Sequence, residues 1–194
     1  MSFENTQEME VHAGIMNTHA NITYLFRDHK SYNIIVNSGM FRYDKAVLCP
    51  DAAMQIGMQH PPIEPTHDIV WLKRKDKESL HSKLPRFPTN LSIVVGDWID
   101  TKTPRGKNLK ETSYKRLMTG FKFLSRGKVI ISDRLHAHIL SVLLGKPNVI
   151  LDNPVYQKVT SFHSTWTPSV GNVLVASNET DAIEKAQDLL HKYY

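Results

Sequence analysis

The most chemically suggestive part of the sequence is a short charged segment directly after an apolar run. The run Val129–Ile131 leads into Ser132, Asp133, Arg134 and, two residues later, His136. The start of a helix offers free backbone N–H groups and about half a positive charge, which favour an anion. The Arg134 guanidinium can grip phosphate or carboxylate through two hydrogen bonds, and the His136 imidazole can exchange a proton near neutral pH. The segment is therefore predicted to bind an anion and to carry acid–base chemistry.

Each of these residues also has a structural interpretation. Ser132 or Asp133 is suited to cap the following helix, and Arg134 can form an ordinary surface ion pair. His138, which lies between apolar neighbours, is more typical of a core histidine than of a catalyst. His136 and His138 could together ligate a metal. No further His, Cys or carboxylate completes a recognisable spacing, so no metal site is predicted.

Two further arginines follow apolar runs. Arg27 follows Ile22–Phe26, and with Asp28 it forms either a self-paired surface feature or a second cation for a doubly anionic ligand. Arg74 follows Asp68–Leu72 within a charged stretch, for which a solvated surface is the default interpretation. In doubly wound sheets, ligands gather at the carboxyl ends of the strands, which makes Arg27 a candidate ligand-binding residue.

Apolar runs that alternate with helix-like segments predict an α/β fold. Strands are expected at 22–26, 46–49, 68–72, 91–95, 129–131, 149–151 and 173–175. Helices are expected at 29–37, 113–125, 134–144 and 179–193, with 155–165 partly helical. Inward-facing side chains are expected at Tyr114, Leu117, Phe121, Leu124, Ala182, Ala186, Leu189 and Leu190. Strands that are apolar throughout and are separated by helices indicate a parallel sheet covered on both faces.

The predicted architecture is a Rossmann-like α/β domain over residues 21–194, preceded by a tail or lead-in segment at residues 1–20. No Gly-rich dinucleotide fingerprint or phosphate-binding P-loop is present. The single cysteine, Cys49, excludes a disulfide within the chain and is expected to be a buried structural thiol.

Composition restricts the class of protein further. The 194 residues carry a formal net charge of +5, which fits either a solvated basic surface or an anionic substrate. Lys and Arg are scattered, with only Lys73–Lys75 as a short run, so no nucleic-acid partner is predicted. The acidic, polar N-terminus is unlike a signal peptide, and no stretch approaches the roughly 18 apolar residues of a membrane span. A soluble, cytoplasmic protein without a transmembrane segment is therefore expected.

The segment Val129–Asn153 also resembles the signature of the polysaccharide pyruvyl transferases. Its sequence is Val-Ile-Ile-Ser-Asp-Arg-Leu-His-Ala-His-Ile-Leu-Ser-Val-Leu-Leu-Gly-Lys-Pro-Asn-Val-Ile-Leu-Asp-Asn. The segments 26–32, 49–51, 74–78 and 158–167 fit the same family pattern. The residues at 153–157, Asn-Pro-Val-Tyr-Gln, depart from the more usual Asn-Ser-Tyr-Gly.

The resemblance implies one half of a B-type glycosyltransferase fold and the transfer of a pyruvyl group from phosphoenolpyruvate to a sugar of a glycan, which forms a cyclic ketal. It implies that Arg27 and Arg134 bind phosphoenolpyruvate and that His136 is the catalytic acid/base. The other implied substrate-binding residues are Ser132, Asp133, Arg74 and Lys158. No cofactor is implied, since phosphoenolpyruvate is a substrate.

Family members usually carry a further N-terminal α/β half, so an N-terminal partner domain or subunit is a candidate partner beside the donor and the sugar acceptor. Two rival functions stay open at this point. One is a nucleotide-sugar glycosyltransferase of similar fold. The other is a non-catalytic glycan- or anion-binding remnant without its partner domain.

Overall fold

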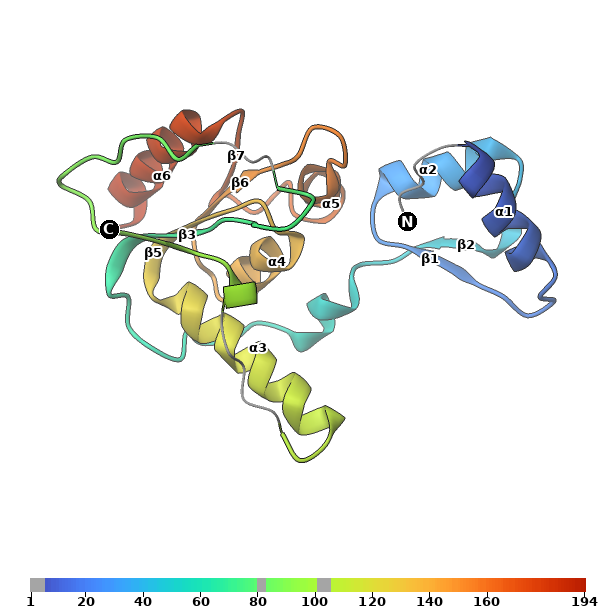
Figure 1. The fold of residues 1–194 in the computed structure, drawn as a ribbon, viewed down its shortest axis with the longest axis horizontal. Coiled ribbons are helices and arrows are strands. Elements are labelled where there is room, and N and C mark those ends of the chain that lie inside the picture. The colour runs from blue at the N-terminus through green and yellow to red at the C-terminus, as the bar shows by residue number, and fades with distance from the viewer. Residues whose placement is uncertain (1–5, 80–82, 101–105) are drawn as a thin grey trace. The chain divides into compact units, whose positions relative to one another are not determined.

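The computed structural model describes residues 6–79, 83–100 and 106–194, and the chain divides into two compact units (Figure 1). The N-terminal unit comprises Met1–Ala52 and Ser161–Pro168. The C-terminal unit comprises Ala53–Thr160 and Ser169–Tyr194. The predicted division, a tail or lead-in segment at residues 1–20 followed by one domain over residues 21–194, stays a prediction. The first part of the described chain forms a small core of its own.

The N-terminal unit combines helices α1 (Thr6–Asn17) and α2 (His29–Ser38) with the strands β1 (Tyr24–Phe26) and β2 (Ala46–Leu48). The two strands pair in parallel. A short 3₁₀ turn, η1 (Tyr43–Lys45), precedes β2. The core of this unit consists of Ala13, Tyr24, Phe26, Ile35 and Phe41. Because Ala13 of α1 is part of this core, residues 6–17 are a packed element rather than a tail.

Local sequence signals explain the ends of α2. The Asp28 side chain accepts a hydrogen bond from the Ser31 backbone N–H at 2.8 Å, which satisfies a free donor of the first turn. Gly39 ends the helix with a φ of 66°, a left-handed conformation that a residue without a Cβ adopts at little cost. The predicted helix at 29–37 is confirmed to within one residue. Cys49, directly after β2, is half-buried rather than fully buried.

The C-terminal unit is built on five parallel strands. They are β3 (His67–Leu72), β4 (Ile93–Gly96), β5 (Gly127–Ser132), β6 (Asn148–Leu151) and β7 (Val173–Ala176), in the order β4-β3-β5-β6-β7. Counted from β3, this is the doubly wound order 2-1-3-4-5, whose switch point lies between β3 and β5. The predicted α/β class with a parallel sheet is confirmed.

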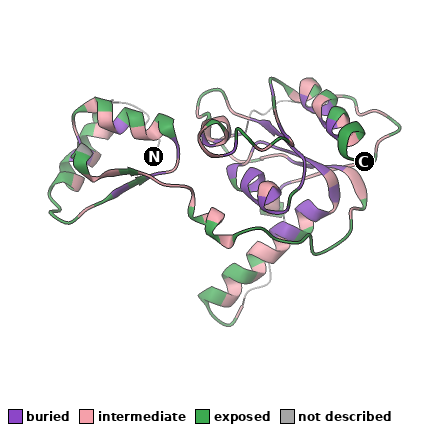
Figure 2. Ribbon diagram, turned by 180° about the vertical axis from the view of Figure 1, so that it is seen from behind, coloured by how far each residue is buried: buried purple, intermediate pink, exposed green. Residues whose placement is uncertain are grey.

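Helices cover both faces of this sheet (Figure 1). On one face, α3 (Leu109–Ser125) packs with α4 (Leu135–Leu143), and on the other α6 (Glu179–Tyr193) packs over β5, β6 and β7. Most residues of the strands β3, β5 and β6 between them are buried (Figure 2). The core on the α6 side consists of Ile69, Trp71, Val129, Ile131, Val149, Leu151, Ala176, Ala182, Ile183, Ala186 and Leu189.

Most of the predicted inward-facing residues are buried or partly buried. Ala182, Ala186 and Leu189 are buried as expected, and Leu190 is partly buried against them. On α3, Phe121 and Leu124 are buried, but Tyr114 is 62% exposed. The buried residues of α3 all lie in its C-terminal half, whereas Tyr114 lies in the second turn, so its assignment to the core was wrong.

The remaining elements connect these layers. The 3₁₀ turns η2 (Ala52–Ile56) and η3 (Trp98–Asp100) precede β3 and α3, and α5 (Lys158–Trp166) lies between β6 and β7. From Ser161 onward, α5 is counted with the N-terminal unit, where Trp166 Nε1 donates to the Arg27 carbonyl oxygen at 2.9 Å. Among the described residues, no helix combines the length and apolar character needed to cross a membrane.

Candidate functional site

Backbone and side-chain hydrogen bonds join the carboxyl ends of β3, β4 and β5. Ser132 Oγ donates to the Leu72 carbonyl oxygen at 2.9 Å and accepts from the Arg134 backbone N–H at 3.1 Å. The Lys73 backbone N–H donates to the Gly96 carbonyl oxygen at 2.9 Å. The residues that follow these three strands are therefore held together at the switch point of the sheet, where doubly wound folds bind ligands.

Asp133 fixes the loop after β3 rather than the helix after β5. Its Oδ1 accepts from the Arg74 backbone N–H at 2.9 Å. The N-cap of α4 is Arg134, which has extended backbone angles and makes no side-chain capping hydrogen bond. The prediction that Ser132 or Asp133 caps this helix is thus wrong, because α4 begins at Leu135 and the N-cap falls after both residues.

Burial raises the pKa of the Asp133 carboxyl to about 6, although the hydrogen bond from the Arg74 N–H and the nearby cations act in the opposite direction. Asp133 is only 6% exposed to solvent. Near neutral pH the folded chain therefore holds a poorly solvated carboxylate directly before Arg134.

This shift predicts a pH-dependent stabilisation by Asp133→Asn. The folded-state pKa of Asp133 lies above the ordinary value of 3.8. The contribution of Asp133 to the free energy of unfolding is therefore most favourable while the carboxyl is protonated, and it falls as pH rises from about 4 through about 6. The difference between these two pKa values corresponds to roughly 3 kcal/mol of stability at pH 7. The asparagine removes this cost and keeps an oxygen that can accept from Arg74. Urea denaturation at a series of pH values checks this. A difference between the two proteins that does not change with pH contradicts it.

Arg134 is held by two carboxylates. Its Nε lies 2.8 Å from Asp97 Oδ1 and its Nη2 lies 2.6 Å from Asp97 Oδ2, which is a two-point fork. The same Nη2 also lies 3.1 Å from Asp76 Oδ2. Asp97, the residue directly after β4, has a fully buried side chain, and that of Arg134 is 12% exposed. The ion pair of Arg134 is therefore not an ordinary surface pair, and the two-point contact with Asp97 fixes the orientation of the guanidinium.

Arg74 and Lys158 extend this cluster. Arg74 pairs with Asp76 through Nε at 2.8 Å and with Glu78 through Nη1 at 2.6 Å. Lys158, at the start of α5, donates from Nζ to Glu78 Oε1 at 2.8 Å. The hydrogen bond from Arg74 lowers the pKa of Asp76 despite some burial. The structure thus brings Ser132, Asp133, Arg134, Arg74 and Lys158 to one edge of the sheet.

The two histidines of the motif have different surroundings. Within α4, every residue from Leu135 to Leu143 is buried or half-buried apart from His136, which is exposed in the first turn. His138 is 1% exposed, and its Nδ1 lies 2.8 Å from the Asn148 side-chain oxygen. The prediction that His138 is a core residue is confirmed, whereas the catalytic role of His136 stays a prediction.

Arg27 belongs to the N-terminal unit. Its Nη1 lies 2.9 Å from Asp51 Oδ2, and its side chain is 37% exposed. The neighbouring Asp28 caps α2 and accepts from Ser161 Oγ at 3.0 Å, so Arg27 and Asp28 are not the self-paired feature that the sequence left open.

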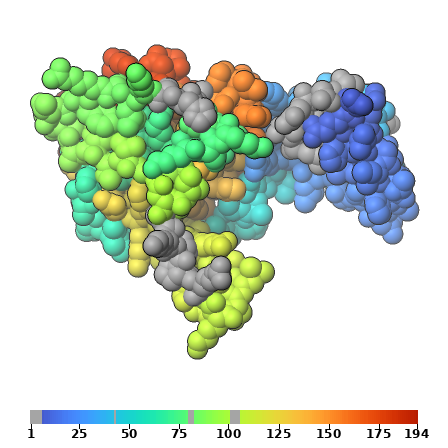
Figure 3. Space-filling view, in the orientation of Figure 1, coloured from blue at the N-terminus to red at the C-terminus, as the bar shows by residue number. Residues whose placement is uncertain are grey.

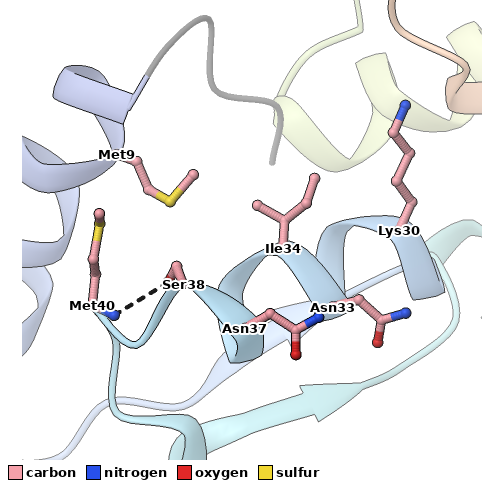
Figure 4. Close-up of a pocket in the computed structure, with 7 residues that line it drawn as sticks. All are labelled: Met9, Lys30, Asn33, Ile34, Asn37, Ser38 and Met40. Carbon is pink, nitrogen blue, oxygen red and sulfur yellow. Dashed lines mark hydrogen bonds between the residues drawn. The ribbon is translucent and has the colours of Figure 1, made fainter.

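Two hollows lie away from the predicted residues. One, with a volume of about 640 Å³, lies between α1 and α2 and is lined by Met9, Lys30, Asn33, Ile34, Asn37, Ser38 and Met40 (Figure 4). The other, of about 480 Å³, lies near the amino end of the sheet, where the buried Lys146 Nζ donates to the Gly127 carbonyl oxygen at 2.8 Å. In the described ranges, no group of three His, Cys, Asp or Glu side chains is placed to hold a metal ion.

Sequence reasoning missed Asp97. One residue separates Asp97 from the predicted strand at 91–95, just as one separates Arg74 from the strand at 68–72, and Ser132 directly follows the strand at 129–131. The convergence of parallel strand ends was therefore a usable signal. The order of the strands was needed to show that Asp97 reaches Arg134.

The sequence is similar to one family model and to two named relatives. The family model for polysaccharide pyruvyl transferases matches residues 5–154. Pyruvyl transferase 1 of Schizosaccharomyces pombe is 31% identical over 205 residues, which cover 96% of this chain and 50% of that protein. The Bacillus subtilis protein EpsO, also named as a pyruvyl transferase, is 25% identical over 87% of this chain and 58% of its own length. The chain thus spans about half the length of these relatives.

A crystal structure of an uncharacterised Klebsiella pneumoniae protein shares the fold, with a TM-score of 0.61 at 17% identity. It matches 91% of this chain and 61% of that chain. The match of the family model to more than half of the sequence, and the identity to the fission-yeast protein, lead to one conclusion. The chain belongs to the polysaccharide pyruvyl transferase family.

Proposed function

We propose that this chain carries the donor site of an enzyme that transfers the pyruvyl group of phosphoenolpyruvate to two hydroxyls of a sugar and so forms a cyclic ketal. The observation that carries the proposal is the fixed guanidinium of Arg134 at the switch point of the sheet, two residues before the exposed His136. Family membership supports a transferase. The donor, the acceptor and the ketal product are the proposed part.

The residue types suit each chemical step. A proton from His136 to the methylene carbon of the enol gives an oxocarbenium-like centre at the carbon that bears the phosphate. One sugar hydroxyl attacks this carbon and phosphate leaves with its bonding electron pair. The second hydroxyl then closes the ring, and the hydroxyl protons pass to the departing phosphate and back to His136. Cations around the donor stabilise its negative charge throughout.

The proposed donor site uses the edge at which Arg74, Arg134 and Lys158 converge. The start of α4 adds the partial positive charge of a helix N-terminus to that edge. The donor-binding role predicted for Arg27, which lies in the N-terminal unit, stays a prediction from the sequence.

Two measurements test the proposal. One compares the affinities of the chain for phosphoenolpyruvate and for a nucleoside diphosphate, and the other follows phosphate release in the presence of a sugar acceptor. Phosphoenolpyruvate is expected to bind in calorimetry more tightly than a nucleoside diphosphate, and to release phosphate only when a galactose- or mannosamine-type acceptor is present. Preference for the nucleoside diphosphate would replace the proposal by a nucleotide-sugar transferase. Tight binding of phosphoenolpyruvate without phosphate release in the presence of the sugar would leave only a binding module.

Arg134→Lys is expected to weaken phosphoenolpyruvate binding by about tenfold or more, because an ammonium keeps the charge but cannot present two parallel donors to an oxyanion. Lysine still pairs with the buried Asp97, which limits the loss of stability. Arg116→Lys, at an exposed position of α3, is the matched control. Equal affinity in the Arg134 and Arg116 variants would remove Arg134 from the donor site.

A further inference from the structure

Six charged side chains form a continuous series of ion pairs at the carboxyl edge of the larger sheet. In order of contact they are Lys158, Glu78, Arg74, Asp76, Arg134 and Asp97. Three are cations and three are carboxylates, so the formal charge of this series is zero when all six are ionised. A neutral series gives little net attraction to a polyanion, although it contains the cations that such a ligand requires. An anion can use these cations fully only if a carboxylate leaves them.

The three carboxylates differ in how firmly they are held. The Asp97 side chain is 0% exposed, and besides Arg134 it accepts from the Lys75 backbone N–H at 3.0 Å. The side chains of Glu78 and Asp76 are 17% and 35% exposed. Moving Asp97 would leave a buried guanidinium without its fork partner, which is costly. Asp76 has the most exposed of the three carboxylates, so its side chain can move into solvent at the lowest cost.

Asp76 also occupies the position that a bound oxyanion would take. Its Oδ2 lies 3.1 Å from Nη2 of Arg74 and 3.1 Å from Nη2 of Arg134, so one oxygen bridges two guanidinium groups. Asp76 lies in the connection from β3 to β4, where the described residues 73–79 and 83–92 form no helix or strand. Much of this connection lies on the surface of the C-terminal unit (Figure 3). A connection of this kind can move without breaking a helix or strand.

We propose that Asp76 is an internal counter-ion: it holds the anion position between Arg74 and Arg134 in the empty protein and is displaced by the anionic donor, whereas Asp97 stays and keeps Arg134 in place. This inference rests on the proposed function, since it takes Arg134 as a donor-binding group. It makes Asp76 a specificity-determining residue. A ligand must supply more than one negative charge to replace the contacts that Asp76 gives up, which favours a donor with both phosphate and carboxylate over monoanions.

The decisive comparison is Asp76→Asn. The amide keeps the size of the side chain but no longer competes as an anion, so phosphoenolpyruvate is expected to bind roughly tenfold more tightly than to the wild type. If Asp76 had only a structural role, phosphoenolpyruvate would bind more weakly to the variant than to the wild type. Asp188→Asn, at an exposed position of α6, makes the same change in net charge away from the site and is expected to leave the affinity unchanged. Calorimetric titration with phosphoenolpyruvate, and separately with inorganic phosphate, measures both.

The outcomes separate the counter-ion from the donor assignment. Equal or weaker phosphoenolpyruvate binding by Asp76→Asn, with clear binding by the wild type, overturns the counter-ion and leaves the proposed function standing. Phosphate that binds more tightly to Asp76→Asn, while phosphoenolpyruvate binds neither protein, supports the counter-ion and removes the proposed donor. Failure of both anions to bind either protein overturns both.

A measurement on the wild type does not depend on how well the variant folds. The Glu78 backbone N–H donates to Asp76 Oδ1 at 3.1 Å. Displacement of Asp76 breaks this bond, so saturating phosphoenolpyruvate is expected to speed hydrogen exchange at Glu78 while β5 is unaffected or protected. Slower exchange at Glu78 on binding would show that Asp76 stays in place and would overturn the proposal.

Discussion

Replacing His136 by asparagine is expected to lower the turnover of phosphoenolpyruvate by about 10²- to 10⁴-fold, the range found when a positioned acid or base is lost. The affinity for the donor should stay within about twofold, because asparagine removes the imidazole but leaves Arg74, Arg134 and Lys158 in place. The reason lies in α4. His136 is exposed in a helix whose other residues pack against the protein, so the substitution leaves the fold unchanged.

The measurement is phosphate release in single-turnover experiments, with donor affinity determined separately by calorimetry. His191→Asn is the matched control, since His191 is an exposed histidine in the last turn of α6. A loss of affinity in parallel with the loss of turnover would place His136 in binding rather than in proton transfer. Equal turnover in the two variants would remove it from the reaction.

Much of the larger unit could be predicted from sequence because its signals are local. Apolar runs gave the five strands of the larger sheet, and α6 was predicted with the bounds that the structure has, Glu179–Tyr193. The division of the chain into two units could not be predicted in this way. It depends on contacts between distant segments, such as the hydrogen bond from Trp166 to the Arg27 carbonyl oxygen, that no periodicity encodes.

The candidate site shows the same distinction. The motif after β5 indicated Arg134 and His136, because residue type and position at a strand end are visible in a single sequence. The carboxylates that pair with Arg134 could not be identified from the sequence. Asp97 and Asp76 follow other strands, and they reach the guanidinium only because β4, β3 and β5 are neighbours in the sheet. The order of parallel strands is a property of the whole fold. The sequence therefore indicated the cationic residues of the site but not the carboxylates that pair with them.

The buried pair between Asp97 and Arg134 predicts the largest effect on stability. Asp97→Ala is expected to destabilise the C-terminal unit by about 3–5 kcal/mol, because it leaves a guanidinium that is 12% exposed without its fork partner. Asp97→Asn keeps the shape and one acceptor and should cost less. Hydrogen exchange of the β5 amides reports opening of this unit by itself, which avoids assuming that both units unfold together. Asp188→Ala, on the exposed side of α6, is the control for the change in net charge.

A double-mutant cycle decides whether the effect comes from the ion pair. If Asp97 acts through Arg134, then Asp97→Ala combined with Arg134→Met should cost less than the sum of the two single changes. Each single change leaves one charge without its partner, whereas the double variant removes both charges. Additive losses would mean that Asp97 stabilises the unit through its other contact, the hydrogen bond from the Lys75 backbone N–H. Coupling would identify the residue after β4 as the group that fixes the orientation of Arg134, and donor affinity in the folded Asp97→Asn protein should then fall in the same direction as in Arg134→Lys.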